Sequence, residues 1–212
     1  MAPATSGKGT ATRQQILLRA ADLASAEGLE SLTIGRLASA LGMSKSGLFA
    51  HFGSKEELQL AVLETAWEVF AREVIEPARP APRGLPRLLA LVEAWLRHVE
   101  HPVFRGGCFF SAACAEYDDR PGRIRDRLVA LTTDWLGAMR AEVGEAMRRG
   151  HIVHDTDDGQ IAFELHAFLQ EANWAYQLHG DATVFERARI AMRRTLASVS
   201  APAHAHLLEE SS

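Results

Sequence analysis

Hydrophobic residues recur at helical spacing along most of the chain. The first such segment begins near Thr12 and ends at Gly28, where a glycine followed by an apolar residue is a common helix terminus. Its apolar positions are Ile16, Ala20, Leu23 and Ala24. No segment alternates between apolar and polar residues with a period of two, so no strand is predicted. The pattern therefore predicts an all-α fold.

Two short amphipathic segments follow. Thr33 is a suitable N-cap for the first, whose apolar stripe stops before Gly42. Ser44 is a suitable N-cap for the second, which ends at Phe52 before another glycine. A helix of about nine residues is marginal in water by itself, so tertiary contacts must hold the second segment in place.

A longer helical region begins at residue 55. Ser54 and Glu57 form the S-x-x-E pattern of a capping box, which marks a helix start. This helix is predicted to end near Glu76, before the breaker-rich stretch "PARPAPRGLP" at 77–86. Further helices are predicted over residues 86–101, 106–117, 122–149, 158–179 and 182–199.

The segment 44–52 has an outward face of small residues. If its two apolar anchors, Leu48 and Phe52, turn toward the core, the face left outside carries Ser46, Gly47 and Ala50. Such a face allows the helix backbone to approach another surface closely. Two short helices joined by a glycine-containing turn form a helix-turn-helix, and its second helix enters the major groove of DNA.

Lys55 stands in the first turn of a predicted helix, where the helix dipole disfavours a cation by about 0.3–1 kcal/mol. The same helix start is an anion site, and a lysine beside it adds a point charge for one phosphate group. We therefore interpret Lys55 as a phosphate contact. The alternative is a solvated lysine that is balanced by Glu56 and Glu57.

Charge is distributed unevenly along the chain. Residues 1–55 contain six basic and three acidic side chains, a net charge of +3, whereas the whole chain carries −4. The remaining 157 residues therefore carry −7. This asymmetry favours different partners for the two parts of the chain.

The stretch "TIGRLASALGMSKSGLFAHFGSKEEL" at 33–58 resembles the DNA-binding segment of TetR-type transcriptional repressors. A second stretch, "RGGCFFSAACAEYDDRPGRIRDRL" at 105–128, is similar to a segment common in such regulators. The resemblance implies a homodimer with one helix-turn-helix per subunit, bound to double-stranded operator DNA. It also implies that a small-molecule effector enters the C-terminal domain and releases the DNA.

The resemblance also implies a set of DNA contacts. By analogy with the family, Thr33, His51 and Lys55 contact phosphates, and Lys45 to Gly47 reach the bases. Phe49 stands where a tyrosine is common, so a hydroxyl–phosphate bond is missing. The DNA-binding residues predicted in this way are Thr33, Arg36, Ser44, Lys45, Ser46, Gly47, Phe49, His51 and Lys55.

Two domains are expected on this basis. Residues 10–57 are predicted to form the helix-turn-helix domain, and the helix that starts at 55 links it to the next domain. Residues 58–200 are predicted to form a helical domain for ligand binding and dimerisation. Residues 1–9 and 201–212 are expected to be flexible.

Aromatic and polar residues in the C-terminal part are candidates to line an apolar ligand cavity. Each of them is more often simply part of the core, because large apolar residues at helical spacing usually lie inside. The ligand would be apolar or amphipathic with one or two polar anchors. The candidate residues are Trp67, Trp95, Phe109, Phe110, Tyr117, Trp135, His166 and Trp174.

Two apolar stripes near the C-terminus suggest how two copies could associate. One lies on the predicted helix 182–199 and the other on 158–179. Pairing of the two stripes across a two-fold axis would give a four-helix interface, as in the family. A role in the intramolecular core is an equally good interpretation of the 158–179 stripe. The residues predicted at the interface are Phe168, Phe185, Met192 and Leu196.

Histidine pairs raise the question of a metal centre. His98 and His101 are three residues apart, as are His151 and His154, and acidic residues follow the second pair. Residues 151–158 more plausibly join two helices. The sequence contains no nucleophile elbow, P-loop or glycine-rich dinucleotide motif, so neither an enzyme, a metal nor a cofactor is predicted.

Length and composition set the remaining bounds. With 212 residues, one or two domains are expected, and 47% hydrophobic residues are enough for a sizeable core. No apolar run approaches the roughly 18 residues needed to span a bilayer. The N-terminal stretch lacks the apolar core of a signal peptide. A cytoplasmic protein without a membrane partner is therefore expected.

The sequence thus predicts a ligand-responsive, DNA-binding transcriptional regulator of the repressor type. Two alternatives remain open at this point. The first is a small-molecule binding protein on a repressor-like scaffold that does not bind DNA. The second is a helical metal-dependent enzyme that uses the cluster at 151–158.

Overall fold

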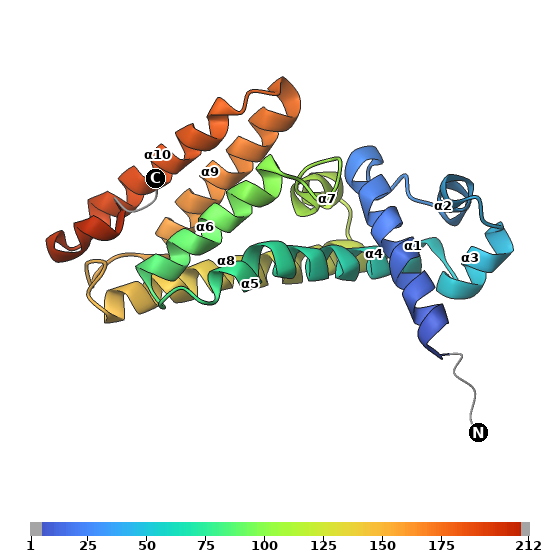
Figure 1. The fold of residues 1–212 in the computed structure, drawn as a ribbon, viewed down its shortest axis with the longest axis horizontal. Coiled ribbons are helices and arrows are strands. Elements are labelled where there is room, and N and C mark those ends of the chain that lie inside the picture. The colour runs from blue at the N-terminus through green and yellow to red at the C-terminus, as the bar shows by residue number, and fades with distance from the viewer. Residues whose placement is uncertain (1–5, 209–212) are drawn as a thin grey trace. The chain divides into compact units, whose positions relative to one another are not determined.

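The computed structural model describes residues 6–208, and the side chains from Thr12 onward. All regular structure in this range is helical (Figure 1). Apart from the helices, the described residues contain one isolated antiparallel bridge between Ile152 and Ser200. The prediction of an all-α fold is confirmed.

The chain divides into two compact units. The first contains residues up to Val69 together with Val103–Ala130, and the second contains Phe70–Pro102 and residues from Leu131 onward. The predicted domain boundary after residue 57 does not coincide with this division, because a segment from the middle of the sequence packs with the N-terminal helices.

The first unit contains the two short helices and the helices that support them. Its helices are α1 (Ser6–Glu27), α2 (Ile34–Leu41), α3 (Lys45–Phe52), most of α4 (Lys55–Phe70), α7 (Phe109–Tyr117) and the start of α8 (Arg123–Arg148). Helix α7 packs against α1. The buried side chains that hold α2 and α3 to this unit include Leu37, Leu48 and Phe52. These contacts supply the stability that a helix of eight residues lacks on its own.

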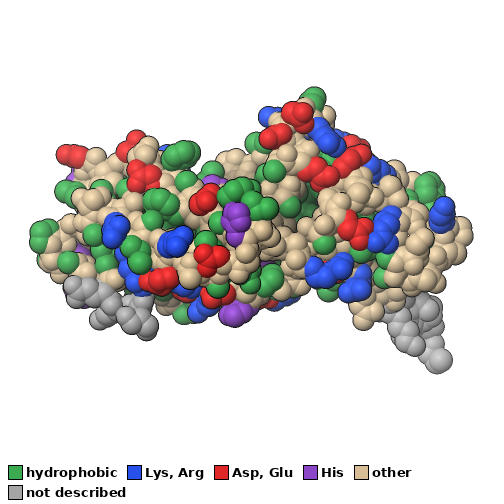
Figure 2. All heavy atoms as spheres, turned by 90° about the horizontal axis from the view of Figure 1, so that it is seen from above, with side chains coloured by type: hydrophobic (Ala, Val, Ile, Leu, Met, Phe, Trp, Pro, Cys, Tyr) green, Lys and Arg blue, Asp and Glu red, His purple; other side chains and the backbone are tan. Residues whose placement is uncertain are grey.

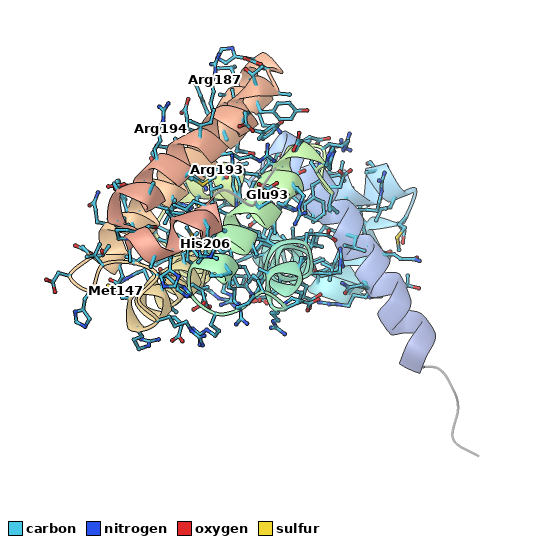
Figure 3. The ribbon with its side chains drawn as sticks, turned by 60° about the vertical axis from the view of Figure 1, so that its left-hand side comes forward. Glu93, Met147, Arg187, Arg193, Arg194 and His206 are labelled. Carbon is cyan, nitrogen blue, oxygen red and sulfur yellow. The ribbon has the colours of Figure 1, made fainter. Side chains whose placement is uncertain are left out.

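The second unit is a bundle in which α6, α9 and α10 pack side by side (Figure 1). Its elements are the π-helical turn Ala71–Ile75, α5 (Glu76–Ala78), α6 (Leu85–Glu100), the rest of α8, α9 (Asp158–His179), α10 (Thr183–Val199) and a 3-10 helix at Pro202–Leu208. Arg189 of α10 donates two hydrogen bonds of 2.9 Å to the carboxylate of Glu93 on α6. Glu93 is labelled in Figure 3. This ion pair joins α10 to α6.

Most predicted helix boundaries agree with the structure to within three residues. The helix expected to end near Glu76 instead continues through a π-helical turn to Ala78. Pro77 lies directly after the π-helical turn, in the three-residue α5 that ends the helical run.

The predicted flexible termini differ from the structure where the structure describes them. Residues 6–9, which were expected to be flexible, lie in α1, and residues 202–208 form the 3-10 helix. The bridge at Ser200 and an edge contact between His204 and His151 attach this C-terminal helix to the second unit. Residues 1–5 and 209–212 lie outside the described part of the chain.

Candidate nucleic-acid interface

Local hydrogen bonds define the start and end of both short helices. The Thr33 hydroxyl accepts the N–H of Arg36 at 3.0 Å and begins α2. Gly42 ends α2 in the left-handed conformation with φ of 64°, which a glycine adopts without strain. The Ser44 hydroxyl accepts the N–H of Gly47 at 3.1 Å and begins α3. Both predicted N-caps are therefore confirmed.

Helix α3 has a buried side and an open side. Leu48 and Phe52 are buried in the first unit. Lys45 and Ser46 are exposed and Gly47 is half-buried. The ring of Phe49 is 57% exposed, which is unusual for an aromatic side chain in a helix of eight residues. The predicted outward face of this helix is thus present.

The stem of Lys45 lies against α2. A Cβ atom added at Gly35 would lie 3.3 Å from Cε of Lys45, so the two helices approach each other closely at this point. A larger side chain at position 35 would displace the lysine stem. The small residue in α2 therefore helps to set the direction of Lys45.

Two of the predicted DNA-contacting cations are paired with carboxylates of their own unit. Lys55 donates to Oε1 of Glu30 at 2.5 Å. Arg36 donates two hydrogen bonds, of 2.9 and 2.6 Å, to the carboxylate of Glu27. Mainly because of the hydrogen bond from Lys55, the pKa of Glu30 is lowered, so this carboxylate is ionised at neutral pH. The prediction from sequence missed both partners, because neither is a sequence neighbour of its cation.

The last two residues of α7 contact the loop between α1 and α2. The carboxylate of Glu116 accepts the N–H groups of Leu29 and Glu30 at 2.7 and 3.1 Å. The hydroxyl of Tyr117 donates to Oε2 of Glu30 at 2.8 Å. Tyr117, which was predicted to bind a ligand, thus donates its hydroxyl to a residue of the loop before α2.

The other predicted ligand residues are divided between the two units. Trp67, Phe109 and Phe110 form a chain of edge contacts in the first unit. Trp95 and Trp135 are buried in the second unit, and Nε1 of Trp135 donates to Nδ1 of the half-buried His166 at 3.4 Å.

Trp174 is not an interior residue. It is 57% exposed on α9, on a helix face that also carries the exposed Phe163 and Leu178. An interior cavity cannot therefore use this side chain. The periodicity of the sequence did not distinguish this exposed stripe from a core stripe.

The second unit contains a buried histidine that the sequence analysis did not select as a ligand contact. His98 of α6 is buried, and its Nδ1 atom has no hydrogen-bond partner among the described residues. Its ring meets the edge of Phe70, which in turn packs edge-on against Trp135. Burial lowers the pKa of His98 and also that of His166, so both rings are neutral at pH 7.

Three of the four residues predicted at a dimer interface are inside the chain. Phe185, Met192 and Leu196 are at most 2% exposed in the single chain, so they are not available to a second copy. They form the inner stripe of α10 that packs onto α9 and α6. Phe168 is half-buried and remains accessible.

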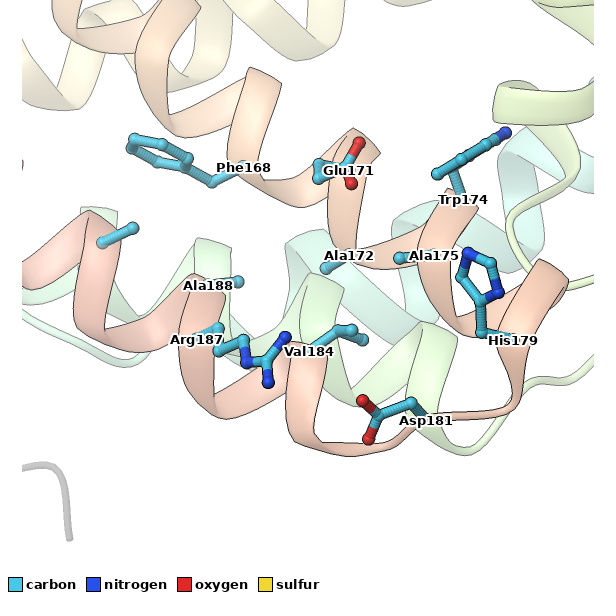
Figure 4. A pocket seen from close by; sticks show the side chains of 11 residues that line it. Phe168, Glu171, Ala172, Trp174, Ala175, His179, Asp181, Val184, Arg187 and Ala188 are labelled. Atoms are coloured by element: carbon cyan, nitrogen blue, oxygen red, sulfur yellow. The ribbon is translucent and has the colours of Figure 1, made fainter.

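The accessible surface of α9 and α10 contains a groove of about 450 Å³ (Figure 4). Phe168, Trp174 and Ala175 line it from α9, and Val184 and Ala188 line it from α10. Arg187 and Arg194 are exposed on α10 (Figure 3). The groove therefore has an apolar floor with charged residues at its border.

Charges of both signs are intermixed on the molecular face drawn in Figure 2. In the first unit, Arg123 pairs with Glu56 and Glu57, and Arg127 pairs with Glu64. Many cations are thus neutralised locally. The number of charges available to a polyanion is therefore smaller than the number of lysines and arginines suggests.

Among the described residues, no group of three or more His, Cys, Asp or Glu side chains is arranged to hold a metal ion. At 151–158, His154 and Asp155 form an exposed pair at 3.5 Å. None of the helices within the described range combines the length and the apolar character that crossing a bilayer requires.

The capped α2–α3 pair, with the exposed outer side of α3, has the geometry of a helix-turn-helix. Residues 16–62 match the family model described as bacterial regulatory proteins of the tetR family. Residues 84–192, about half of the chain, match the model for the tetracyclin repressor-like C-terminal domain. The chain therefore belongs to the TetR family, as the motif at 33–58 predicted.

Two curated relatives resemble the N-terminal part. The chain is 34% identical over 89 residues to the HTH-type transcriptional activator FasR of Mycolicibacterium smegmatis, an alignment that covers 42% of this chain and 41% of FasR. It is 42% identical over 62 residues to the HTH-type transcriptional repressor AcnR of Corynebacterium efficiens, covering 29% of this chain and 33% of AcnR. The chain thus matches less than half the length of these relatives.

Solved structures resemble the chain over most of its length. A TetR transcriptional regulator from Chloroflexus aurantiacus superposes with a TM-score of 0.80 at 25% identity, covering 95% of this chain and 94% of that one. AibR, solved in complex with isovaleryl coenzyme A and operator DNA, gives a TM-score of 0.69 at 19% identity, covering 88% and 97%. At this identity the likeness to AibR is one of fold.

Proposed function

We propose that the chain is a ligand-responsive transcriptional regulator that binds operator DNA as a homodimer. The observation that carries this proposal is the open face of α3, which is capped by Ser44 and anchored by two buried side chains. A short helix whose outer residues are exposed, small or basic fits the major groove. Membership of the TetR family supports the same conclusion.

Within this proposal, individual side chains have different roles. Lys45, Ser46 and Gly47 at the start of α3 lie where base edges are read in a helix-turn-helix. The exposed ring of Phe49 supplies an apolar contact for a sugar or a thymine methyl group. Thr33, His51 and Lys55 contact phosphates. Arg36 reaches a phosphate only if it leaves Glu27, so its contribution is smaller.

The homodimer is proposed to form through the outer faces of α9 and α10. Phe163, Trp174 and Leu178 expose apolar surface there, and the groove beside Phe168 can receive side chains of a second copy. Self-association matters because two recognition helices must be held about 34–36 Å apart to meet successive major grooves.

The effector is proposed to be a small apolar or amphipathic molecule that binds in the second unit. The aromatic cluster around Phe70 and Trp135 supplies apolar surface. His98 and His166 supply polar anchors, and the Nδ1 atom of His98 is a buried group with unused hydrogen-bonding capacity. AibR, which is solved with an acyl coenzyme A and DNA together, supports a design in which one chain binds both.

The direction of regulation is proposed to be repression, with release of the operator when the effector binds. The motif at 33–58 resembles TetR-type repressors, and the relative AcnR is a repressor. The relative FasR is an activator. A reporter gene placed behind the DNA upstream of this chain's own gene distinguishes repression from activation. Deletion of the regulator should raise the reporter signal.

The DNA-binding role is tested with a panel of duplexes derived from the chain's own upstream region. Lys45→Ala should relax the preference for the best duplex by about 1–3 kcal/mol, because a base contact is lost. Arg97→Ala, an exposed charge change on α6, is the matched control and should leave this preference unchanged. If the wild type prefers no duplex over unrelated DNA, the scaffold is better explained as a small-molecule binding protein.

A further inference from the structure

The carboxylate of Glu30 connects a predicted DNA contact to α7. Its Oε1 atom accepts from Nζ of Lys55 at 2.5 Å, and its Oε2 atom accepts from the Tyr117 hydroxyl at 2.8 Å. Lys55 is the first residue of α4, and Tyr117 is the last residue of α7. One side chain in the loop between α1 and α2 therefore contacts both helices.

The backbone of the same loop is held by α7. Glu116 accepts the N–H groups of Leu29 and Glu30, as described above. Gly28 has a φ of 90°, and a Cβ atom there would lie 2.9 Å from Oε1 of Glu116. The positive φ favours a glycine at this position, and the short distance shows that the carboxylate of Glu116 lies directly against it. The loop that carries Glu30 is thus positioned by two neighbouring side chains of α7.

A buried glutamine reinforces the arrangement. Nε2 of Gln59 donates to the carbonyl oxygen of Leu29 at 2.7 Å and to the Tyr117 hydroxyl at 3.3 Å. Burial and the neighbouring carboxylate of Glu30 raise the pKa of Tyr117, so its hydroxyl keeps its proton and remains a donor to Glu30. These contacts favour one position of the Glu30 side chain, the one that holds Lys55.

This geometry has a consequence for phosphate binding. A lysine paired with a carboxylate presents little net charge to an approaching anion. A phosphate that binds Lys55 must therefore either displace the carboxylate or accept its repulsion. The position of Glu30 is in turn set by α7 rather than by the helix-turn-helix itself.

We infer that Glu30 is an internal competitor of DNA for Lys55, and that Tyr117 and Glu116 of α7 keep it in the competing position. The inference rests on the proposed function. A displacement of α7 that withdraws these two side chains would release Glu30 and leave Lys55 available to a phosphate. Glu30, Glu116 and Tyr117 are thus positioning residues that regulate DNA affinity without touching DNA.

The test compares DNA affinity and its salt dependence in full-length variants. Glu30→Gln removes the charge with almost no change of shape. It should tighten binding to the preferred duplex by roughly two- to fivefold, the range that an exposed ion pair allows. The slope of log K against log salt concentration should steepen by about one, because one more lysine neutralises a phosphate. Tyr117→Phe should act in the same direction with a smaller effect.

A double-mutant cycle shows whether the effect passes through Lys55. In a Lys55→Ala background, Glu30→Gln should no longer steepen the salt slope. Glu64→Gln is the matched control, because Glu64 lies on α4 like Lys55 and is paired with a different cation, Arg127. This variant should change neither the DNA affinity nor the salt slope. Thermal unfolding of each variant verifies that the comparison is made between folded proteins.

The outcomes separate the inference from the proposed function. Tighter and steeper binding by Glu30→Gln, lost in the Lys55→Ala background, supports the competitor role. Unchanged or weaker binding, or an effect that persists without Lys55, overturns it while the regulator itself still binds DNA. If Glu30→Gln tightens DNA binding and Tyr117→Phe does not, the proposed role of α7 in holding Glu30 is overturned. If the wild type binds no duplex, the proposed function fails, and the inference fails with it.

Discussion

At the scale of single residues, His98 combines burial with an unused hydrogen-bonding atom. A buried polar atom without a partner costs about 1–3 kcal/mol. His98→Leu, which has a similar volume, should therefore leave the free energy of unfolding unchanged or raise it by about 1 kcal/mol. It should also weaken the binding of effectors found in a thermal-shift screen. Urea unfolding and ligand titration of the variant measure the two effects, and a strongly destabilised variant would show that the ring has a structural partner.

Histidine burial also predicts how stability depends on pH. The pKa values of His98 and His166 are lowered in the folded chain, whereas unfolded histidine titrates near 6.5. The unfolded state then binds more protons, so these two residues cost no stability above about pH 6.5 and cost stability as the pH falls below it. The melting temperature should fall between pH 7 and pH 5. The decline should be smaller in His98→Leu, and an equal decline in both proteins would contradict this assignment.

At the scale of secondary-structure elements, Ser44 is the N-cap on which α3 depends. Ser44→Ala should destabilise the chain by about 1 kcal/mol and weaken DNA binding, because a helix of eight residues has few other hydrogen bonds to maintain it. Ser39→Ala is the matched control, since Ser39 is exposed within α2 and alanine is a better helix former. Urea unfolding and binding isotherms report the two effects. Equal behaviour of the two variants would show that the cap is unimportant.

The contact between α1 and the segment before α7 is equally specific. A Cβ atom at Gly106 would lie 1.8 Å from the carbonyl oxygen of Ser25, where backbone blocks any relaxation. Gly106→Ala should therefore destabilise the chain by at least about 2 kcal/mol. Gly137→Ala in α8 has open space around its Cβ and should instead stabilise by about 0.5–1 kcal/mol. Chemical denaturation of both variants is the measurement, and a harmless Gly106→Ala would contradict the described contact.

The elements themselves were predictable because their signals are local. Each helix end is defined by hydrogen bonds to residues at most four positions away, as at Thr33, Ser44 and Gly42. The same local patterns do not reveal which apolar stripe of a helix meets the chain's own core. Phe185 and Met192 are internal because their stripe of α10 packs onto α9 and α6, whereas Trp174 lies on a face of α9 that stays exposed.

The candidate site was predictable to the same extent. The outward residues of α3 follow from helix periodicity once Leu48 is taken as an anchor. The pairing of Lys55 with Glu30 spans 25 residues, and the contact of Glu30 with Tyr117 spans 87 residues. No spacing rule connects such positions. Sequence reasoning therefore identified the cation, and it missed both the carboxylate paired with Lys55 and the hydroxyl that donates to this carboxylate.

At the scale of the whole molecule, the proposal requires two copies. Trp174→Glu should place a charge in the apolar surface of α9 and convert the dimer to a monomer. Operator affinity should fall steeply, because one recognition helix alone reaches a single half-site. Val153→Glu alters another exposed apolar residue of the second unit and is the matched control. Sedimentation measurements distinguish the states, and a dimeric Trp174→Glu variant would mean that copies associate through a different surface.

The central claim is that this chain binds duplex DNA as a pair of helix-turn-helix units. The most direct measurement is a titration of its own upstream duplex over a range of salt concentrations, with the mass of the complex determined in parallel. Two chains should bind each preferred duplex, and log K should decrease linearly with log salt concentration. The preference over unrelated DNA should be about 10³-fold or more. Binding that is absent, that does not depend on salt, or that involves one chain without sequence preference would contradict this claim.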